Sequence, residues 1–365
     1  MAKKTLFIQP FYFYAGHYFQ AFNNFIYNIR KIDRYDFLVS VNNDVNNKSF
    51  YIDFKKILKL KKIYTFKSSK NSFSKINIFK SFLYIIKNRN SYENFFFYDC
   101  KIFTLTYLFF FTSYLFKSNN FYIYAHYGPE FLNKSIFKNF FLINFLKKKN
   151  TKIFLRTKEL QKDWINKLPI YKNKIKYLKS IDYPDLKYSK SINRNKKIVF
   201  GCVGQIRNGK SLKFLNNFFK LNKKYQFKII GSFANDEVKN SFKFIDEKFL
   251  TNNKFLNYNK LVNTSKKLDY IVLLYDNFFD KRYEVSTLYL AIKLNIPVIC
   301  FDDGSWLSKK IKSYNCGLTI KNLSKFDNFP NRYSKKYKEL IKNLEKFNIS
   351  ELNIDLDIKR LKRLF

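Results

Sequence analysis

A glycine, an arginine and a lysine occur at three-residue spacing directly after an apolar run in the second half of the chain. The run from Ile198 ends at Gly204, and Arg207 and Lys210 follow, ahead of a segment with apolar residues at helical spacing. A glycine at a strand end allows a tight turn, and cations at the first turn of a helix bind a diphosphate together with free backbone amides. The pattern therefore predicts a diphosphate site. An ordinary loop with surface cations is the alternative.

Four further side chains have types that suit such chemistry. His17, next to Gly16, and His126 each follow an apolar run and lie beside a glycine. An imidazole at such a position can act as a general base or position a substrate, with a loop imidazole that caps a carbonyl as the alternative. Ser286 and Thr287 begin a helical pattern, where their hydroxyls and free amides suit a phosphate.

The elements that would position these residues alternate between strand and helix patterns along the whole chain. Short apolar runs ending in Gly, Pro, Asn or Asp alternate with helix-period segments, which predicts parallel βα units. The strands expected in the first half are Thr5–Gln9, Phe37–Val41, Lys62–Phe66, Phe95–Tyr98, Phe121–Ala125 and Lys152–Leu155. Those expected in the second half are Lys197–Val203, Phe227–Ile230, Phe255–Leu256, Tyr270–Leu274, Val298–Phe301 and Leu318–Ile320.

Length and composition predict two domains. A chain of 365 residues with 46% hydrophobic residues exceeds one ordinary core, since single domains rarely pass about 300 residues. The polar stretch that follows Pro184 loses periodicity, as is typical of a linker. We expect two open α/β domains, one over 1–185 and one over 197–350, with a linker over 186–196 and a tail over 351–365. A ligand would bind between the carboxyl ends of the two sets of strands.

The second half resembles a known family, the retaining glycosyltransferases of family 4. The resemblance rests on the loop from Gly204 to Lys210, on the strand and glycine turn from Phe227 to Ser232, and on the stretch that contains Pro297-Val298-Ile299 and a later Gly-Leu. These enzymes have the GT-B fold, in which two Rossmann-like domains face each other across a cleft. The resemblance therefore implies the same fold here.

The resemblance also implies roles for individual residues. The loop after Gly204 would hold the diphosphate of a nucleotide-sugar donor through Arg207 and Lys210. Cations and helix amides would then replace a metal ion in stabilising the departing diphosphate. His126 would lie at the sugar pocket, and Gly16 with His17 in a loop that faces donor and acceptor.

Two positions depart from the family pattern. With Pro297 as the anchor, the two glutamates that the family carries eight positions apart would fall at Arg282 and Leu290. Glu284 is our substitute for the carboxylate on the sugar side, with a helix-terminal acid as the alternative. The pair Leu290-Ala291 resembles a branch of the family with a Gly-Gln-Ile-Arg loop. The contact to the ribose stays unassigned.

Together with the diphosphate pattern, the resemblance implies an enzyme that transfers a sugar from a nucleoside-diphosphate donor to a hydroxyl of a glycan or lipid-linked acceptor. Retention of configuration is implied by the resemblance, and neither a cofactor nor a metal ion is expected. An inverting transferase with His17 as general base is one alternative. A non-catalytic protein that binds polyanions is another, since the net charge is +43. The cations are spread over both halves of the chain, which favours the enzyme, and no nucleic-acid partner is expected.

Metal and disulfide chemistry are not expected. The Asp355-Leu356-Asp357 motif lies near the end of the chain, and Asp302-Asp303-Gly304 fits a tight turn. The four cysteines are widely spaced, which indicates buried free thiols in a reducing compartment. They are Cys100, Cys202, Cys300 and Cys316.

Hydropathy predicts a cytoplasmic protein without a membrane span. The apolar run Ile102–Phe116 is shorter than the about 20 residues that cross a bilayer, so a core helix is expected. The lysine-rich helices expected within Lys75–Lys87 and Phe131–Lys149 either contact the inner face of an anionic membrane or expose a solvated lysine face over a normal core.

Overall fold

The chain separates into two compact units. The first comprises Met1–Tyr183 with Ile354–Phe365, and the second comprises Pro184–Asn353. The computed structural model describes residues 4–10, 25, 35–41, 63–67, 75–98, 101–125, 128–129, 135–178, 197–206, 209–233, 236–252, 256, 258–275, 285–351, 359 and 362–363. The expected boundaries of linker and tail stay predictions, because residues 179–196 and most of 352–365 lie outside these ranges.

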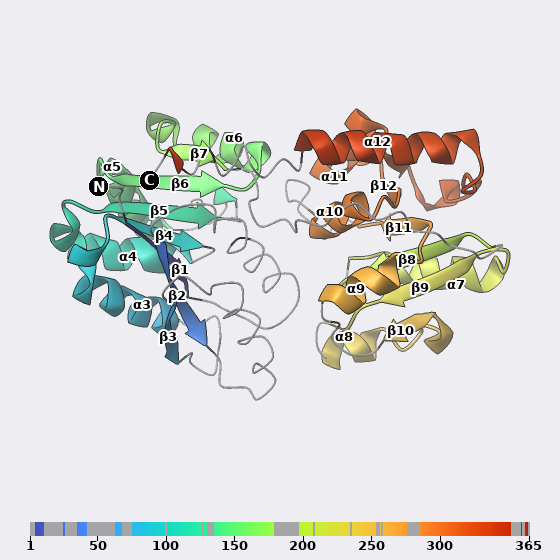
Figure 1. Ribbon diagram of the computed structural model, residues 1–365, viewed down its shortest axis with the longest axis horizontal. Coiled ribbons are helices and arrows are strands. Elements are labelled where there is room, and N and C mark those ends of the chain that lie inside the picture. Colours follow the sequence, from blue (N-terminus) through green and yellow to red (C-terminus); the bar gives the residue numbers. More distant parts are fainter. Residues whose placement is uncertain are drawn as a thin grey trace. The chain divides into compact units, whose positions relative to one another are not determined.

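The first unit contains a sheet of seven parallel strands in the order β3-β2-β1-β4-β5-β6-β7 (Figure 1). The strands are β1 (Thr5–Gln9), β2 (Tyr35–Val41), β3 (Ile63–Lys67), β4 (Asn94–Tyr98), β5 (Asn120–Ala125), β6 (Thr151–Leu155) and β7 (Ile175–Tyr177). Every residue of β1 and β4 is buried, as expected for parallel strands covered on both faces. The strand order reverses between β1 and β4, which defines the switch point of a doubly wound sheet.

In the described part of the first unit, four helices cover one face of this sheet. They are α3 (Lys75–Lys87), α4 (Ile102–Thr112), α5 (Ile136–Lys147) and α6 (Lys158–Lys167), with the short 3₁₀ helices η2 (Arg89–Ser91), η3 (Ser113–Phe116) and η5 (Pro169–Tyr171). The connections from β3 through β7 all advance in one direction along the sheet, so right-handed crossovers place these helices on the same side. Helix α4 packs against both α3 and α5.

The second unit contains a sheet of six parallel strands in the order β10-β9-β8-β11-β12-β13. The strands are β8 (Val199–Val203), β9 (Gln226–Ile230), β10 (Leu250–Asn252), β11 (Tyr270–Leu273), β12 (Val298–Phe301) and β13 (Gly317–Ile320). The helices are α7 (Leu212–Leu221), α8 (Asp236–Ser241), η6 (Glu247–Phe249), α9 (Tyr258–Ser265), α10 (Ser286–Lys293), α11 (Trp306–Tyr314), η7 (Leu323–Lys325) and α12 (Lys335–Glu351). The switch point of this sheet lies between β8 and β11.

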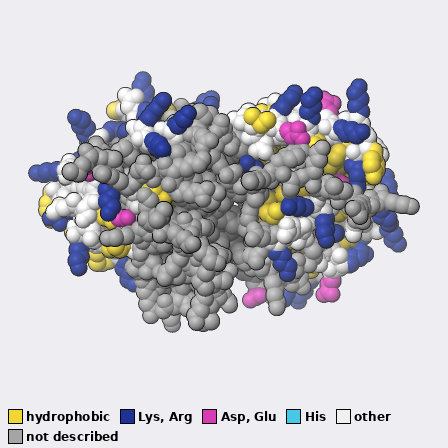
Figure 2. All heavy atoms as spheres, in the orientation of Figure 1, with side chains coloured by type: hydrophobic (Ala, Val, Ile, Leu, Met, Phe, Trp, Pro, Cys, Tyr) yellow, Lys and Arg dark blue, Asp and Glu magenta, His cyan; other side chains and the backbone are white. Residues whose placement is uncertain are grey.

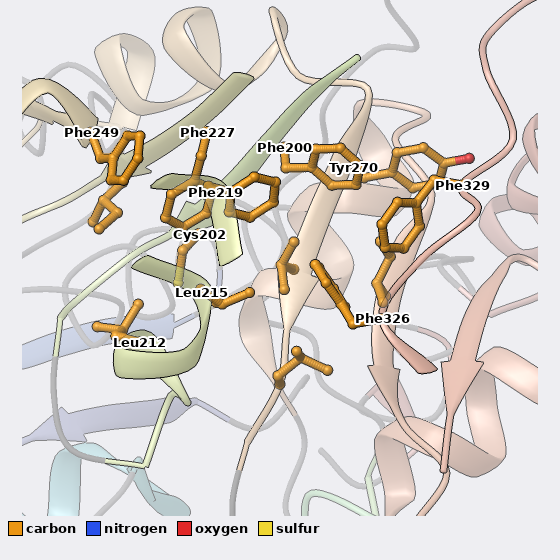
Figure 3. Packing of buried hydrophobic residues seen from close by; sticks show 14 of the residues in the cluster. Phe200, Cys202, Leu212, Leu215, Phe219, Phe227, Phe249, Tyr270, Phe326 and Phe329 are labelled. Carbon is orange, nitrogen blue, oxygen red and sulfur yellow. The ribbon is translucent and has the colours of Figure 1, made fainter. Parts of the chain in front are cut away.

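Aromatic rings fill the core of the second unit (Figure 3). The ring of Phe200 on β8 stacks on Tyr270 of β11 at 5.4 Å between centroids, and Phe219 of α7 stacks on Phe227 of β9 at 4.4 Å. Phe329, which follows η7, contacts Phe200 edge-on at 4.8 Å. Residues from α7 and from the segment after β13 therefore close one continuous core over β8.

A buried carboxylate ties the segment before α12 to the amino end of this sheet. Asp269 precedes β11, and its carboxylate accepts hydrogen bonds from the Val199 amide at 2.7 Å and from the Arg332 guanidinium at 3.1 Å. Its carbonyl oxygen accepts a hydrogen bond from the Tyr337 hydroxyl at 2.9 Å. A buried charge with these partners is compensated, so this cluster fixes the segment rather than destabilising the core.

Most expected strands coincide with observed ones, and two differences have a physical cause. The expected strand Phe255–Leu256 is wrong, because the strand lies at Leu250–Asn252 and Leu256 is not in a strand. Edge strand β10 is short and pairs with β9 in a shifted register, so its sequence carries little periodicity. Strand β7 was not expected, since only Ile175 among its three residues is buried.

The structure also bears on the hydropathy predictions. The run Ile102–Phe116 is helical, as expected, with its last four residues in η3. None of the helices in the described ranges combines the length and the apolar character that a membrane span requires. Cys202, Cys300 and Cys316 are buried free thiols, as predicted. Cys100 lies outside the described residues.

Candidate functional site

Strand β8 ends at Gly204, at the switch point of the second sheet. Its neighbours are β9 on one side and β11 on the other. Because crossovers leave these strands toward opposite sides, the space beyond the strand ends is open to a ligand in folds of this type. Gly204 has a φ of 95°, which strains any residue with a side chain. The predicted tight turn after β8 is therefore confirmed.

A second glycine fixes this turn from the neighbouring strand. The Gly204 amide donates a hydrogen bond to the Ile230 carbonyl at 2.9 Å, and the Ile206 amide donates to the Ser232 carbonyl at 2.8 Å. A Cβ at Gly231, where φ is 152°, would lie 2.0 Å from the Gly204 carbonyl oxygen. Only glycine allows this approach, so Gly231 belongs to the site, although the sequence indicated only a strand-end turn there.

Lys210 is held at the same strand end and is only 6% exposed. Its Nζ donates a hydrogen bond to the Val203 carbonyl oxygen at 3.3 Å, and a Cβ at Gly204 would lie 3.9 Å from that Nζ. Gly209 and Ser211 on either side have φ values of 89° and 39°. These left-handed residues turn the chain so that the lysine side chain returns to β8. The surface-cation alternative is therefore wrong for Lys210.

Helix α10 brings hydroxyl and amide groups to this turn. The helix begins at Ser286, as predicted, and a Cβ at Gly204 would lie 3.7 Å from Thr287 Oγ1. The N-cap residue, Val285, provides no side-chain hydrogen bond to the first turn. Unpaired amides at a helix start carry partial positive charge. Lys210 and Thr287 thus both lie beside Gly204, next to the start of α10.

The rest of α10 is buried on all sides. All residues from Leu288 to Lys293 are buried. The reason is that α12 packs on the outside of α10. Leu290, at the position of the family's second glutamate, is only 6% exposed. It offers no group to a ribose.

The surroundings of the Cys202 thiol on β8 shift its pKa. Burial raises the pKa of this thiol, and the nearby Lys210 ammonium has the smaller, opposite effect. Because the effect of burial is larger, the thiol stays neutral near pH 7. It therefore adds no negative charge that would neutralise Lys210.

Several predicted site residues lie outside the described residues, and their roles stay predictions. The strands that lead to two of them are described. Strand β1, which precedes His17, ends at Gln9 at the switch point of the first sheet, and β5, which precedes His126, ends at Ala125. The residues concerned are Gly16, His17, His126, Arg207 and Glu284.

The first of the two aspartate motifs, Asp302-Asp303-Gly304, lies among the described residues and forms a turn. Asp303 Oδ1 accepts a hydrogen bond from the Ser305 amide at 3.0 Å, and Gly304 has a φ of 72°, so the predicted tight turn is confirmed. The Lys312 ammonium pairs with the Asp302 carboxylate at 2.5 Å. Asp355 and Asp357 lie outside the described residues. The described part of the chain contains no group of three His, Cys, Asp or Glu side chains placed to hold a metal ion.

Comparison with known proteins identifies the fold. No protein-family model matches the chain, and no curated protein matches its sequence. A glycosyltransferase from Rickettsia africae is similar, with a TM-score of 0.68 at 12% identity over 100% of this chain and 98% of that chain. TarM from S. aureus gives 0.62 at 10% identity over 99% of each chain. The catalytic domain of Arabidopsis thaliana starch synthase IV gives 0.59 at 9% identity over 100% of each chain.

These similarities extend over the whole chain and agree with the two parallel sheets. The expected GT-B fold, with two Rossmann-like domains, is therefore confirmed. The expected resemblance to glycosyltransferases is confirmed at the level of the fold.

Proposed function

We propose that this protein is a retaining glycosyltransferase that moves a sugar from a nucleoside-diphosphate donor to a hydroxyl of a glycan or lipid-linked acceptor, without a metal ion. The observation that carries the proposal is the meeting of Lys210 and Thr287 at Gly204, beyond the end of β8. The similar TarM structure contains UDP, and the starch synthase structure contains ADP. Both ligands support a nucleoside diphosphate as the anion that this site would bind.

The arrangement would assist departure of the diphosphate. Negative charge grows on the bridging phosphate oxygen as the bond to the sugar breaks, and groups placed to bind that charge lower the barrier. The Lys210 ammonium, the Thr287 hydroxyl and the first amides of α10 are donors of this kind. Because Lys210 is buried and hydrogen-bonded to the Val203 carbonyl before the reaction, little reorganisation is needed when the charge develops.

Residues outside the described ranges complete the proposed mechanism. Arg207 would supply a second cation to the diphosphate, while His126 and Glu284 would position the donor sugar. Gly16 and His17 would lie in the loop that contacts the acceptor. In the retaining reaction proposed here, the leaving phosphate accepts the proton of the acceptor hydroxyl.

Donor binding tests this site directly. A thermal-shift screen of nucleotide sugars identifies a donor, and calorimetry then measures its affinity for the wild type and for Lys210→Met, which keeps the aliphatic stem. A charge-assisted hydrogen bond contributes about 1.5 to 3 kcal/mol, so Lys210→Met should bind the donor about 10- to 150-fold more weakly. Lys213→Met removes an exposed lysine from the first turn of α7 and serves as the matched control, with an expected change below about twofold.

Two results would contradict the proposal. One is unchanged donor affinity in Lys210→Met, with the melting temperature of the variant preserved. The other is an equal loss in Lys210→Met and Lys213→Met, which would indicate unspecific attraction between cations and the nucleotide. In both cases the diphosphate site at Gly204 would have to be abandoned.

A further inference from the structure

Helix α4 exposes aromatic side chains on the side that faces away from the sheet. The residues of α4 that face the sheet and are buried are Ile102, Leu105, Thr106 and Phe109. The helix contains no charged residue on any side. Tyr107, Phe110, Phe111 and Tyr114 in α4 and η3 follow helical spacing and are 36% to 67% exposed. A helix that is apolar all round is normally buried. The exposed aromatic stripe of α4 and η3 is therefore expected to be covered by a partner.

Helix α5 continues the same surface. Ile136, Phe137 and Phe140 in its first turns are 49% to 90% exposed. The Phe110 and Phe140 rings meet at 5.3 Å between centroids, and Phe137 meets the buried Phe141 at 4.7 Å. The exposed residues of both helices therefore form one contiguous patch, here named the aromatic face: Tyr107, Phe110, Phe111, Tyr114, Ile136, Phe137 and Phe140.

Helix α3 adds a parallel apolar stripe. Ile76, Phe79 and Leu83 recur at helical spacing and are about half exposed, at 54%, 49% and 51%. Helix α3 packs against α4 (Figure 1). Three neighbouring helices on one face of the first sheet thus expose apolar residues, more than the scattered single residues normal for a surface.

Charges around the aromatic face have one sign. Residues 75–92, 101–125 and 135–158 contain no Asp or Glu. Lysines flank the face instead, with Lys117 after η3 and Lys147 and Lys148 at the end of α5 exposed. Lys138 of α5 lies over the Phe103 ring, with Nζ 5.6 Å from its centroid. Hydrophobic and cationic side chains are accordingly adjacent on the surface of the first unit (Figure 2).

We infer that the aromatic face docks on the surface of an anionic lipid bilayer. Aromatic residues flanked by lysines are the combination that inserts at the headgroup level of such a bilayer. A symmetric pair of two copies would place lysines of one copy against lysines of the other, with no acidic residue on these helices to compensate. No described helix is suited to span a membrane, so the contact is with the bilayer surface.

Flotation of the full-length protein with lipid vesicles tests the inference. We expect binding to vesicles that contain phosphatidylglycerol, weaker binding to pure phosphatidylcholine, and weaker binding as salt rises from about 0.1 to 0.5 M, because screening shortens the reach of the charges. Replacing one half-exposed phenylalanine by serine should weaken partitioning about fivefold. The triple variant of Phe111, Phe137 and Phe140 to serine should therefore weaken it on the order of 100-fold.

Matched controls separate docking from general stickiness and from misfolding. Leu221→Ser, Tyr333→Ser and Ile349→Ser remove residues of the second unit that are 77% to 83% exposed, and this triple variant should bind vesicles like the wild type. Charge reversal of Lys147 and Lys148 to glutamate should weaken binding only to the anionic vesicles. The far-ultraviolet spectrum and the melting temperature of each variant report whether the fold is intact.

The inference is independent of the proposed function, because vesicle binding requires no sugar donor and no transfer. Equal binding to anionic and neutral vesicles, or no binding to either, would overturn it. A dimer in the absence of lipid that dissociates in the phenylalanine triple variant would also overturn it, by assigning the aromatic face to a second copy of the chain.

Discussion

Substitution of Gly231 by alanine tests the close approach between the ends of β8 and β9. The added Cβ would lie 2.0 Å from the Gly204 carbonyl oxygen, whereas carbon and carbonyl oxygen come into contact at about 3.3 Å. One of the two backbones must therefore move by about 1.3 Å. Overpacking of this kind costs about 1 to 3 kcal/mol, and the φ of 152° adds about 1 to 3 kcal/mol for a residue with a side chain. The expected loss is about 2 to 6 kcal/mol.

Differential scanning calorimetry measures this loss as a shift in the unfolding of the second unit. One kcal/mol corresponds to about 2 to 4 °C for a unit of this size, so Gly231→Ala should lower Tm by roughly 10 °C. Gly304→Ala is the matched control, because Gly304 also has a positive φ, 72°, but an added Cβ there meets nothing within 4 Å. The control should lower Tm by only about 2 to 8 °C. Equal shifts in the two variants would refute the steric argument.

Three further predictions concern alkaline stability, the buried carboxylate and the reaction itself. Burial raises the pKa of the Cys316 thiol from 9.0 to about 12. The neutral thiol therefore stabilises the folded state fully below about pH 9, and this contribution is lost as pH rises and the unfolded chain ionises. Cys316→Ala should accordingly flatten the decline of Tm between pH 9 and 11. Arg332→Met should destabilise the protein by about 3 kcal/mol in urea unfolding, since it leaves the Asp269 carboxylate buried with one partner fewer, and a change below about 0.5 kcal/mol would contradict this. Once a donor is identified, proton NMR of the product should show retained configuration at the anomeric carbon, and EDTA should leave the transfer rate unchanged. His17→Ala should lower the transfer rate far less than the 10²- to 10⁴-fold expected for loss of a general base. His126→Ala should lower kcat.

The fold was predictable because buried parallel strands leave a strong trace in the sequence. Val298–Phe301 is an uninterrupted apolar run between Pro297 and Asp302, and the strand occupies those residues. In Thr5–Gln9 the apolar centre Leu6–Ile8 likewise marks an observed strand. Two edge strands, β7 and β10, leave a weaker trace, because each is only three residues long. Strand β10 was therefore placed several residues too late, and β7 was missed.

The site was predictable in its residue types but not in its contacts. Lys210 and Thr287 were selected for chemistry that suits a phosphate, and the structure places both beside Gly204. The burial of Lys210 and the contact of Gly231 with Gly204 depend on the register of β8 against β9, in which Val203 pairs with Ile230. Register is a long-range property, and no local pattern around either residue encodes it.

The cluster at Asp269 has a consequence for synthesis of the chain on the ribosome. Its partner Arg332 is 63 residues further along the sequence, and at about 5 to 20 residues per second the ribosome needs roughly 3 to 13 s to produce them. During that interval the carboxylate has no guanidinium to pair with, and Phe200 has no Phe329 to cover it. Until these residues are made, the second unit therefore lacks two contacts of its finished core. Substitutions within 326–337 should therefore reduce the yield of folded protein much more than the rate at which each folded molecule works.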